Sequence, residues 1–169
     1  MVKERATSSS NTDEPTDVLI IGGGVAGMMA AVGCRRSGVR PVLMTKATYP
    51  SGSSSMARGG HTAAFGHSHP DDKPEFLYED SVQAAYDLCN LRLMRVMSHE
   101  AIDRTIGLDA WGLGLVWIKD GRYNQKPSAS HRYDRLLHCG KLMGKPLMNS
   151  LFKKELEAFL WICFSSRCL

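Results

Sequence analysis

The start of the chain alternates apolar runs with glycine in a pattern that predicts strand, helix and strand. Residues 18–21 (VLII) form a short apolar run that ends at glycine, as expected for a strand buried on both faces. The alanine-rich segment 26–37 fits a helix that ends at Gly38. Residues 39–44 are again mainly apolar. The segment therefore predicts a β-α-β unit and an α/β fold.

The remainder of the chain predicts a loop followed by mainly helical segments. Residues 47–72 are small and polar, which favours an ordered loop with one short helical turn. Asp72 can cap the next helix, because Glu75 completes a capping box and Pro74 is tolerated in the first turn. The methionines of 94–97 are expected to fill the core. Further elements are expected at 91–97, 100–111 and 145–159 (helices) and at 115–124 (an Asp-Gly hairpin).

Composition places the chain among globular proteins and excludes several classes. Its 169 residues are 43% hydrophobic and 22% charged, as in ordinary soluble domains. The net charge of +4 comes without a block of like charge, so no nucleic acid partner is expected. No apolar run reaches the roughly 18 residues of a transmembrane segment. The polar N-terminus and five cysteines without a CxxC motif favour a cytoplasmic location with reduced thiols and no metal site.

The two ends of the chain differ from the part between them. Residues 1–16 are polar and predict a disordered tail. Residues 159–169 are apolar and aromatic, which suggests a strand without its partners or the product of a truncated or frameshifted reading frame. The residues between these two ends start with the β-α-β unit.

Three glycines between the first strand and the first helix carry the clearest chemical signal. Gly22, Gly24 and Gly27 fit the GxGxxG motif. The first allows a sharp turn off the strand, the second lets a diphosphate approach the backbone, and the third lets the helix lie close to the strands. Gly23 and Ala26 keep the surface small, while free N–H groups and the helix dipole favour an anion. The motif predicts a dinucleotide-binding, Rossmann-like domain.

The next two segments bear on which dinucleotide binds. An NAD site, like many FAD sites, has an acidic residue at the end of the second strand, whereas this chain has Thr45 and Lys46. These two residues argue against NAD and leave FAD and NADP open. The following loop, SGSSSMARGGHTAAFG, is rich in glycine and serine, and it could lay N–H groups and hydroxyls along a cofactor. The alternative for this loop is a flexible linker.

Four stretches, taken in order, resemble a known flavoprotein family. They are DVLIIGGGVAGMMAA, MTK, GSSSMARGGHTAAFG and HRYDRLLHCGKLMGKPL. The family is that of fumarate reductase and succinate dehydrogenase, and the pattern is most similar to L-aspartate oxidase and adenylylsulfate reductase. The resemblance covers residues 17 to about 158. It implies that residues 17–158 form the N-terminal part of a Rossmann-like FAD-binding domain, which is incomplete and contains a helical insertion.

The resemblance also implies which residues meet the cofactor. The glycine turn would contact the pyrophosphate, Lys46 would lie near the adenosine and phosphate end, and the serine-rich loop would run toward the isoalloxazine ring. Succinate dehydrogenases bond a histidine covalently to the flavin at the position of Ser53, so non-covalent FAD is implied. Arg58 replaces a glutamine that is common in the family. The expected cofactor-binding residues are Gly22, Gly23, Gly24, Val25, Ala26, Gly27, Thr45, Lys46, Gly52, Ser53, Ser54, Ser55, Gly59 and Gly60.

By resemblance, the chain is the FAD-binding part of a flavoprotein oxidoreductase of the fumarate reductase, succinate dehydrogenase or aspartate oxidase type. The full-length family performs two-electron redox on a small anionic, dicarboxylate-like substrate, and its members often pair with an iron–sulfur subunit. The catalytic groups belong to segments that this chain does not match, so no catalytic residue is predicted. Two alternatives stay open: a truncated fragment without turnover that binds FAD weakly or not at all, and a short NADP-binding domain.

Two polar clusters have both a functional and a structural interpretation. The histidines of the second loop and the aspartates after it could suggest a metal site, but their spacing is not diagnostic and favours a polar loop, in which one histidine could face the flavin. The basic residues around position 135 could reach an anion or could be structural. These residues are His61, His67, His69, Asp71 and Asp72 in the first cluster, and His131, Arg132, Arg135 and His138 in the second.

Overall fold

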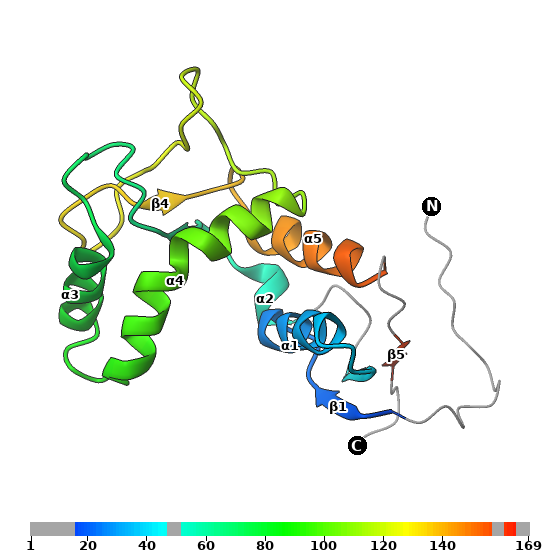
Figure 1. Ribbon diagram of the computed structural model, residues 1–169. Helices are drawn as coiled ribbons and strands as arrows, with labels where there is room; N and C mark the ends of the chain where they lie inside the picture. Colours follow the sequence, from blue (N-terminus) through cyan, green and yellow to red (C-terminus); the bar gives the residue numbers. More distant parts are fainter. Residues whose placement is uncertain (1–15, 47–51, 157–160, 165–169) are drawn as a thin grey trace.

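A computed structural model describes residues 16–46, 52–156 and 161–164, and these form an α/β fold (Figure 1). The predicted tail, up to residue 15, and most of the segment 159–169 lie outside the described residues. The elements are β1 (Val18–Ile21), α1 (Val25–Arg36), β2 (Pro41–Thr45), α2 (Ser53–Met56), β3 (His61–Thr62), α3 (Pro74–Ala84), α4 (Leu91–Ala110), β4 (Leu136–Leu137), α5 (Gly144–Leu156) and β5 (Trp161–Phe164).

A three-stranded parallel sheet, ordered β1-β2-β5, carries the first part of the fold. Val18 pairs with Pro41 and Val42 with Trp161 along the two ladders. The predicted β-α-β unit is therefore confirmed, and the apolar segment near the C-terminus pairs with β2 instead of lacking a partner. The crossover from β2 to β5 includes every element from α2 to α5, which is the predicted helical insertion.

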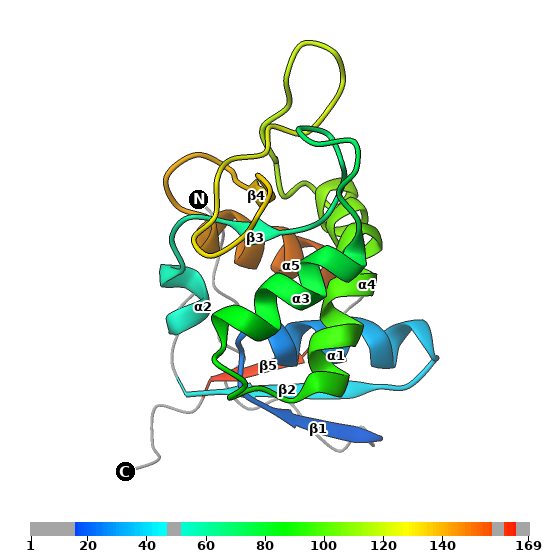
Figure 2. The same cartoon turned by 90° about the vertical axis from the view of Figure 1, so that its left-hand side faces the viewer.

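Helix α1 lies over one face of this sheet, and α5 packs against α1 (Figure 2). Met28 on α1, Leu43 on β2, and Met148 and Leu151 on α5 have 0% exposure and form one core cluster. The buried residues of α1 follow helical spacing, since Met28 is followed by Ala31 and Val32. Burial of this stripe holds the helix against the sheet and fixes where its N-terminus points.

The second face of β1 is open, which corrects the prediction of a strand buried on both faces. Leu19 is 52% and Ile21 80% exposed, while Val18 and Ile20 are half-buried. A parallel sheet buries both faces only when helices cover each of them. Among the described residues, no helix covers this face of β1.

A second, smaller sheet organises the insertion. β3 and β4 pair antiparallel, with His61 opposite Leu137. Leu137 belongs to a second core cluster with Ala63, Leu113, Leu115, Tyr123 and Met143. Leu108 and Leu147 pack against both core clusters, so the insertion and the parallel sheet share a continuous apolar interior.

Helix α4 is longer than the sequence pattern indicated. It runs without interruption for 20 residues, and Asn90 caps it by accepting a hydrogen bond from the Leu93 N–H (3.1 Å). The two short helices predicted here are therefore wrong, because no proline or glycine breaks the chain between them. Met97 is 40% exposed, so it does not fill the core as expected. No helix in the described part of the chain combines the length and apolar character needed to cross a bilayer.

Two local predictions around the insertion have different outcomes. The capping box is wrong, because α3 begins after Lys73 without any side-chain cap. Asp72 instead pairs with the buried Arg135. The hairpin is confirmed by its hydrogen bonds, in which the Ile118 N–H donates to the Arg122 carbonyl (2.9 Å) and the Asn124 N–H to the Val116 carbonyl (2.9 Å).

Gly144, the first residue of α5, allows the close approach of α5 to α2. A Cβ atom at this position would lie 2.3 Å from the Ser54 carbonyl oxygen and 2.7 Å from the Ala57 nitrogen. Both are backbone atoms, so neither can rotate away. The Gly144 N–H also donates to the Ala57 carbonyl (2.9 Å). The N-terminus of α5 therefore fixes the position of α2.

We predict that Gly144→Ala lowers the free energy of unfolding by about 1–3 kcal/mol, the usual cost of overpacking. Gly107→Ala is the matched control, because nothing lies within 4 Å of a Cβ placed there in α4. This control should raise the free energy of unfolding by about 0.5–1 kcal/mol. Urea unfolding followed by circular dichroism measures both. Equal effects of the two substitutions would contradict the packing described for α5.

Candidate cofactor-binding site

The turn between β1 and α1 presents bare backbone at a helix N-terminus. Gly22 has a φ of +119°, a conformation that favours glycine, and nothing lies within 4 Å of a Cβ placed on it. Its N–H donates to the Met44 carbonyl (2.8 Å), which ties the turn to β2. Gly24 is the N-cap of α1 and offers no side-chain cap. The first N–H groups of a helix have no intrahelical acceptor, so this turn can donate to an anion.

The helix itself lies close against the turn. A Cβ atom on Gly27 would lie 1.9 Å from the Gly22 carbonyl oxygen and 3.4 Å from Cγ2 of Ile20. Only glycine permits this approach of α1 to the turn and to β1. Each of the three glycines of the motif therefore has a separate role in the geometry.

The fold brings the end of β2 and helix α2 to the same turn. The Val25 N–H donates to Ser54 Oγ at 3.3 Å. A Cβ on Gly24 would lie 3.1 Å from Ser54 Oγ, and one on Gly23 would lie 2.9 Å from Thr45 Oγ1. Residues separated in sequence thus meet around one small space, as Figure 1 shows for α1 and α2. Lys46, the next residue after β2, is exposed.

The second loop is ordered, so the flexible-linker alternative is not supported for residues 52–62. Gly52 and Gly59 have φ values of +83° and +76°. Ser55 is buried, and its hydroxyl donates to the Gly52 carbonyl (2.8 Å). A Cβ on Gly60 would lie 1.7 Å from the Leu137 carbonyl oxygen. The loop is therefore fixed against β4 at one end and against α1 at the other. Ser53, the first residue of α2, is exposed.

The chemistry of these groups fits the diphosphate of a dinucleotide. The donors at the turn are backbone N–H groups at a helix N-terminus, where the helix dipole stabilises negative charge. The side chains that approach the turn, Thr45 and Ser54, carry hydroxyls, which can donate or accept. The position after β2 holds a lysine and no carboxylate. The small residues leave the backbone accessible.

The histidines of the second loop do not come together. Among the described residues, no group of three or more histidine, cysteine, aspartate or glutamate side chains could hold a metal. Their partners differ: His61 Nε2 contacts Thr105 Oγ1 (2.7 Å), His67 Nδ1 accepts from the Tyr123 N–H (2.9 Å), and His69 Nε2 lies 3.9 Å from Asp134 Oδ2.

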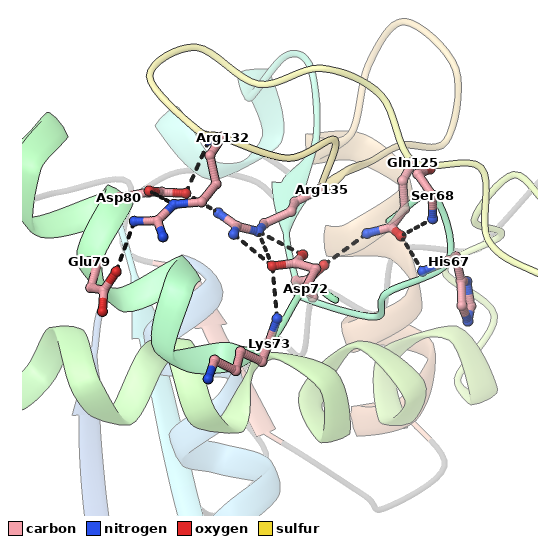
Figure 3. Close-up of polar contacts among 10 residues, drawn as sticks. His67, Ser68, Asp72, Lys73, Glu79, Asp80, Gln125, Arg132 and Arg135 are labelled. Atoms are coloured by element: carbon pink, nitrogen blue, oxygen red, sulfur yellow. Dashed lines mark hydrogen bonds and ion pairs between the residues drawn. The ribbon is translucent and has the colours of Figure 1, made fainter. Parts of the chain in front are cut away.

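The arginines of the second polar cluster form ion pairs, and those of Arg135 are buried (Figure 3). Arg135 has 0% exposure and donates to both oxygens of Asp72 (2.6–3.0 Å) and to Asp80 Oδ2 (2.6 Å). Arg132 donates to Asp80 Oδ1 (2.7 Å) and to Glu79 (2.8 Å). These contacts favour the structural interpretation of both arginines. They hold α3 against the segment that leads into β4.

Sequence reasoning missed Asp80, although the sequence contained a signal for it. Asp80 lies three residues after the fully buried Leu77 on α3, so an acid occupies the apolar stripe of that helix. Burial opposes ionisation of this carboxyl, but hydrogen bonds from Arg135 and Arg132 outweigh burial and hold its pKa below the ordinary value. Asp80 is therefore a buried carboxylate at neutral pH.

His138 is also buried, and one of its ring nitrogens has a partner. Its Nδ1 accepts from the Gly140 N–H (3.2 Å), while Nε2 is buried without a hydrogen bond to any residue that the structure describes. Burial and the nearby Lys126 both lower its pKa. His138, which directly follows β4, is therefore a neutral side chain at neutral pH, and no anion contact is assigned to it.

Comparison with known proteins decides the family. The model of the FAD binding domain family matches residues 17–164, most of the chain. The chain belongs to this family of FAD-binding domains. The cofactor of the family is FAD, which disfavours the alternative of a short NADP-binding domain.

Curated relatives agree with this assignment. The FAD-binding domain is 32% identical over 136 residues to a chain of the CoM/CoB fumarate reductase of Methanothermobacter marburgensis, and the match covers 80% of this chain and 25% of the relative. It is 34% identical over 124 residues to the L-aspartate oxidase of Streptomyces coelicolor. That match covers 73% of this chain and 21% of the relative. The chain thus spans about a quarter of the length of the curated relatives it matches.

Solved structures share the fold of this FAD-binding domain. Sdh1 of Mycobacterium smegmatis is 27% identical with a TM-score of 0.79, and the match covers 86% of this chain and 27% of that protein. The FrdA chain of the E. coli quinol fumarate reductase has a TM-score of 0.81 at 21% identity. That match covers 87% of this chain and 25% of FrdA. The second match supports the fold alone. The resemblance seen in the sequence and the expected fold are both confirmed.

We predict that Arg135→Met lowers the free energy of unfolding by about 3–5 kcal/mol, because it leaves the buried Asp72 without its ion pair and removes one of the two arginines that hold Asp80. Arg104→Met is the matched control, since it breaks an exposed pair with Glu100 in α4 and should cost less than about 1 kcal/mol. Urea unfolding of both variants tests this. If both variants lost a similar amount of unfolding free energy, burial of the Arg135 ion pairs would not increase the cost of breaking them, which would contradict the prediction.

A pH series tests the depressed pKa of Asp80. Its ionised form is stabilised by folding, so its contribution is complete above the unfolded pKa of about 4. The contribution is lost as the pH falls through the lower, folded pKa. The difference in unfolding free energy between the wild type and Asp80→Asn should therefore be constant near neutral pH and shrink below about pH 4. A difference that grows on acidification would contradict the ion-pair assignment.

Proposed function

We propose that this domain holds FAD non-covalently through the glycine turn and α2. The observation that carries the proposal is the convergence of Ser54 Oγ on the N-terminus of α1, 3.3 Å from the Val25 nitrogen. The turn would donate N–H bonds to the pyrophosphate, with Thr45 and Lys46 toward the adenosine end. Gly52, Ser53, Gly59 and Gly60 would then follow the cofactor toward its ring. A serine at position 53 offers no imidazole for a covalent bond to the flavin.

We further propose that, in a full-length protein, this domain serves two-electron redox of a small anionic, dicarboxylate-like substrate. The names of the relatives, fumarate reductase and L-aspartate oxidase, support this substrate class. FAD when bound supplies the hydride chemistry, and the residues of this chain bind and orient it. Family resemblance points to an iron–sulfur protein as the electron partner. No catalytic acid or base is assigned to this chain.

The coverage of the relatives supports a second candidate function. The chain spans 21–25% of the first two relatives, and one face of β1 is open. The second candidate is a domain that, on its own, binds FAD weakly and without turnover. Cys34, Cys89 and Cys139 are free thiols, which is consistent with the predicted cytoplasmic location.

We predict that the purified chain takes up FAD and that Gly24→Val weakens this binding at least about tenfold. A branched side chain at Gly24 would occupy the space beside Ser54 Oγ that the diphosphate needs. Gly33→Ala is the matched control in the same helix, because nothing lies within 4 Å of a Cβ there. Quenching of FAD fluorescence on titration gives both affinities. Unchanged binding by Gly24→Val would contradict the proposed site, and absence of turnover with added fumarate would favour the second candidate.

We also predict that all bound flavin leaves the protein on acid denaturation. Ser53 offers no ring nitrogen to form a flavin bond, so the supernatant should carry the full yellow absorbance. Ser53→His is the informative variant, since it restores the residue type that bonds the flavin covalently in succinate dehydrogenases. Flavin that stays with the denatured wild-type chain would overturn the non-covalent assignment.

A further inference from the structure

A small pocket of about 190 Å³ lies beside the C-terminal ends of α4 and α5. Trp111, which ends α4, lines this pocket and also packs against the core cluster of Met28 and Met148, so the core fixes its position. The volume is below the roughly 300 Å³ of typical sites for organic ligands, and a small group fits it best. The lining residues are Ala110, Trp111, Gly112, Lys153 and Lys154.

The end of α1 brings another cation to the same tryptophan. The central carbon (Cζ) of the Arg36 guanidinium lies 5.2 Å from the centre of the Trp111 ring, a distance at which a cation and an aromatic face attract each other. Lys153 and Lys154 line the pocket from the last turn of α5. Basic side chains from two helices are therefore gathered around one indole ring.

Two of these cations have no carboxylate partner in the part of the chain that the structure describes. Arg36 and Lys153 form no ion pair there, unlike the arginines at positions 104, 122, 132 and 135. Asp109, the acid nearest to Trp111 along α4, accepts instead from the Leu115 N–H (3.0 Å) and from the hydroxyl of residue 123, a tyrosine (3.2 Å). Positive charges that are held close together repel each other, so an anion between them would be stabilised.

Helix dipoles account for only part of this arrangement. Basic residues near a helix C-terminus are stabilised by its unpaired carbonyl groups, but these carry only about half a negative charge per helix. Helices α1 and α5 each end with two basic residues, which are Arg35 and Arg36 in α1 and Lys153 and Lys154 in α5. Even when the acid Glu155 is counted, positive charge remains in excess at these two helix ends. The excess favours an anionic ligand over a neutral one.

We propose that this pocket binds a small phosphate-type oxyanion, which Arg36 and Lys153 hold against Trp111. Guanidinium and ammonium groups are common partners of phosphate, and the indole N–H of Trp111 is a further donor. The pocket lies at the C-terminal end of α1, whose 12 residues separate it from the glycine turn by about 18 Å. It is therefore a second anion site, and it does not rest on the proposed function.

The first test uses NMR to follow the isotope-labelled chain while inorganic phosphate replaces chloride at constant ionic strength. Saturable shifts are expected for the indole N–H of Trp111 and the amide of Gly112, with a dissociation constant on the order of 1 mM, as for partly exposed charge contacts. Trp111→Phe identifies the indole resonance. Phosphate bound at the glycine turn would shift the amides of Gly22 to Gly27, so the two sites are read separately.

The second test removes single charges from the pocket. Arg36→Met and Lys153→Met each keep an unbranched side chain and should weaken phosphate binding at least about threefold. Arg92→Met is the matched control and should leave binding unchanged, because this exposed residue lies in the first turn of α4, at the other end of that helix from Trp111. Arg36→Lys keeps the charge and should retain most of the affinity. Circular dichroism establishes that each variant is folded.

Two further ligands identify the chemistry of the anion. Acetate, which is planar and singly charged, should bind at least about threefold more weakly than phosphate. Glycerol 3-phosphate carries the phosphate group as an ester. Saturable binding of either phosphate at the pocket supports the site, and the tighter of the two identifies whether the free ion or an ester is the source.

The proposal is overturned if phosphate shifts no resonance of the pocket, or if the shifts do not saturate. Equal phosphate affinities of Arg36→Met, Lys153→Met and the wild type would show that these cations do not hold the anion, which overturns it as well. Acetate binding as tight as that of phosphate would contradict a phosphate-type ligand. Failure of FAD to bind the chain would count against the proposed function alone.

Discussion

The site depends on backbone N–H groups at the start of α1 that the helix cannot satisfy itself. Intrahelical hydrogen bonding begins four residues into a helix, and glycine at the N-cap offers no side chain to replace it. Ser54 reaches one of these groups from the next loop. The remaining donors lie in a turn of small residues, where the helix dipole favours negative charge. A diphosphate is the ligand that such an arrangement fits.

Several packing constraints keep these groups in place, and they come from distant parts of the chain. Gly27 lets α1 rest on the turn, and Gly144 lets α5 lie against α2. At the other end of the loop, Gly60 lies against β4, which follows the buried Arg135. The ion pairs of Arg135 with two carboxylates therefore stabilise the insertion on which the loop rests. A buried pair of this kind adds little net stability when intact but costs much when broken.

Local sequence signals predicted the parts of the fold that depend on local geometry. The strand, glycine turn and helix from Val18 to Arg36 follow from hydrophobic pattern and motif, and the structure agrees within a residue. The exposure of Ile21 and the pairing of Asp72 with Arg135 could not be predicted this way. The exposure of Ile21 depends on whether another layer covers the sheet. The ion pair depends on a contact between two residues that lie 63 positions apart in the sequence. Capping by Asp72 and burial of Met97 failed for the same reason, because tertiary contacts override local preference.

The N-terminus of α1 and the first turn of α2 together are proposed to hold the diphosphate of FAD. The most direct measurement is an NMR titration of the isotope-labelled chain with FAD, followed through its backbone amide resonances. Binding at this place predicts saturable shifts of the amides of Gly22 to Gly27 and of Ser53 to Ser55, with the Val25 amide among the largest. FAD-dependent shifts confined to other segments, with the glycine turn unaffected at saturation, would contradict it.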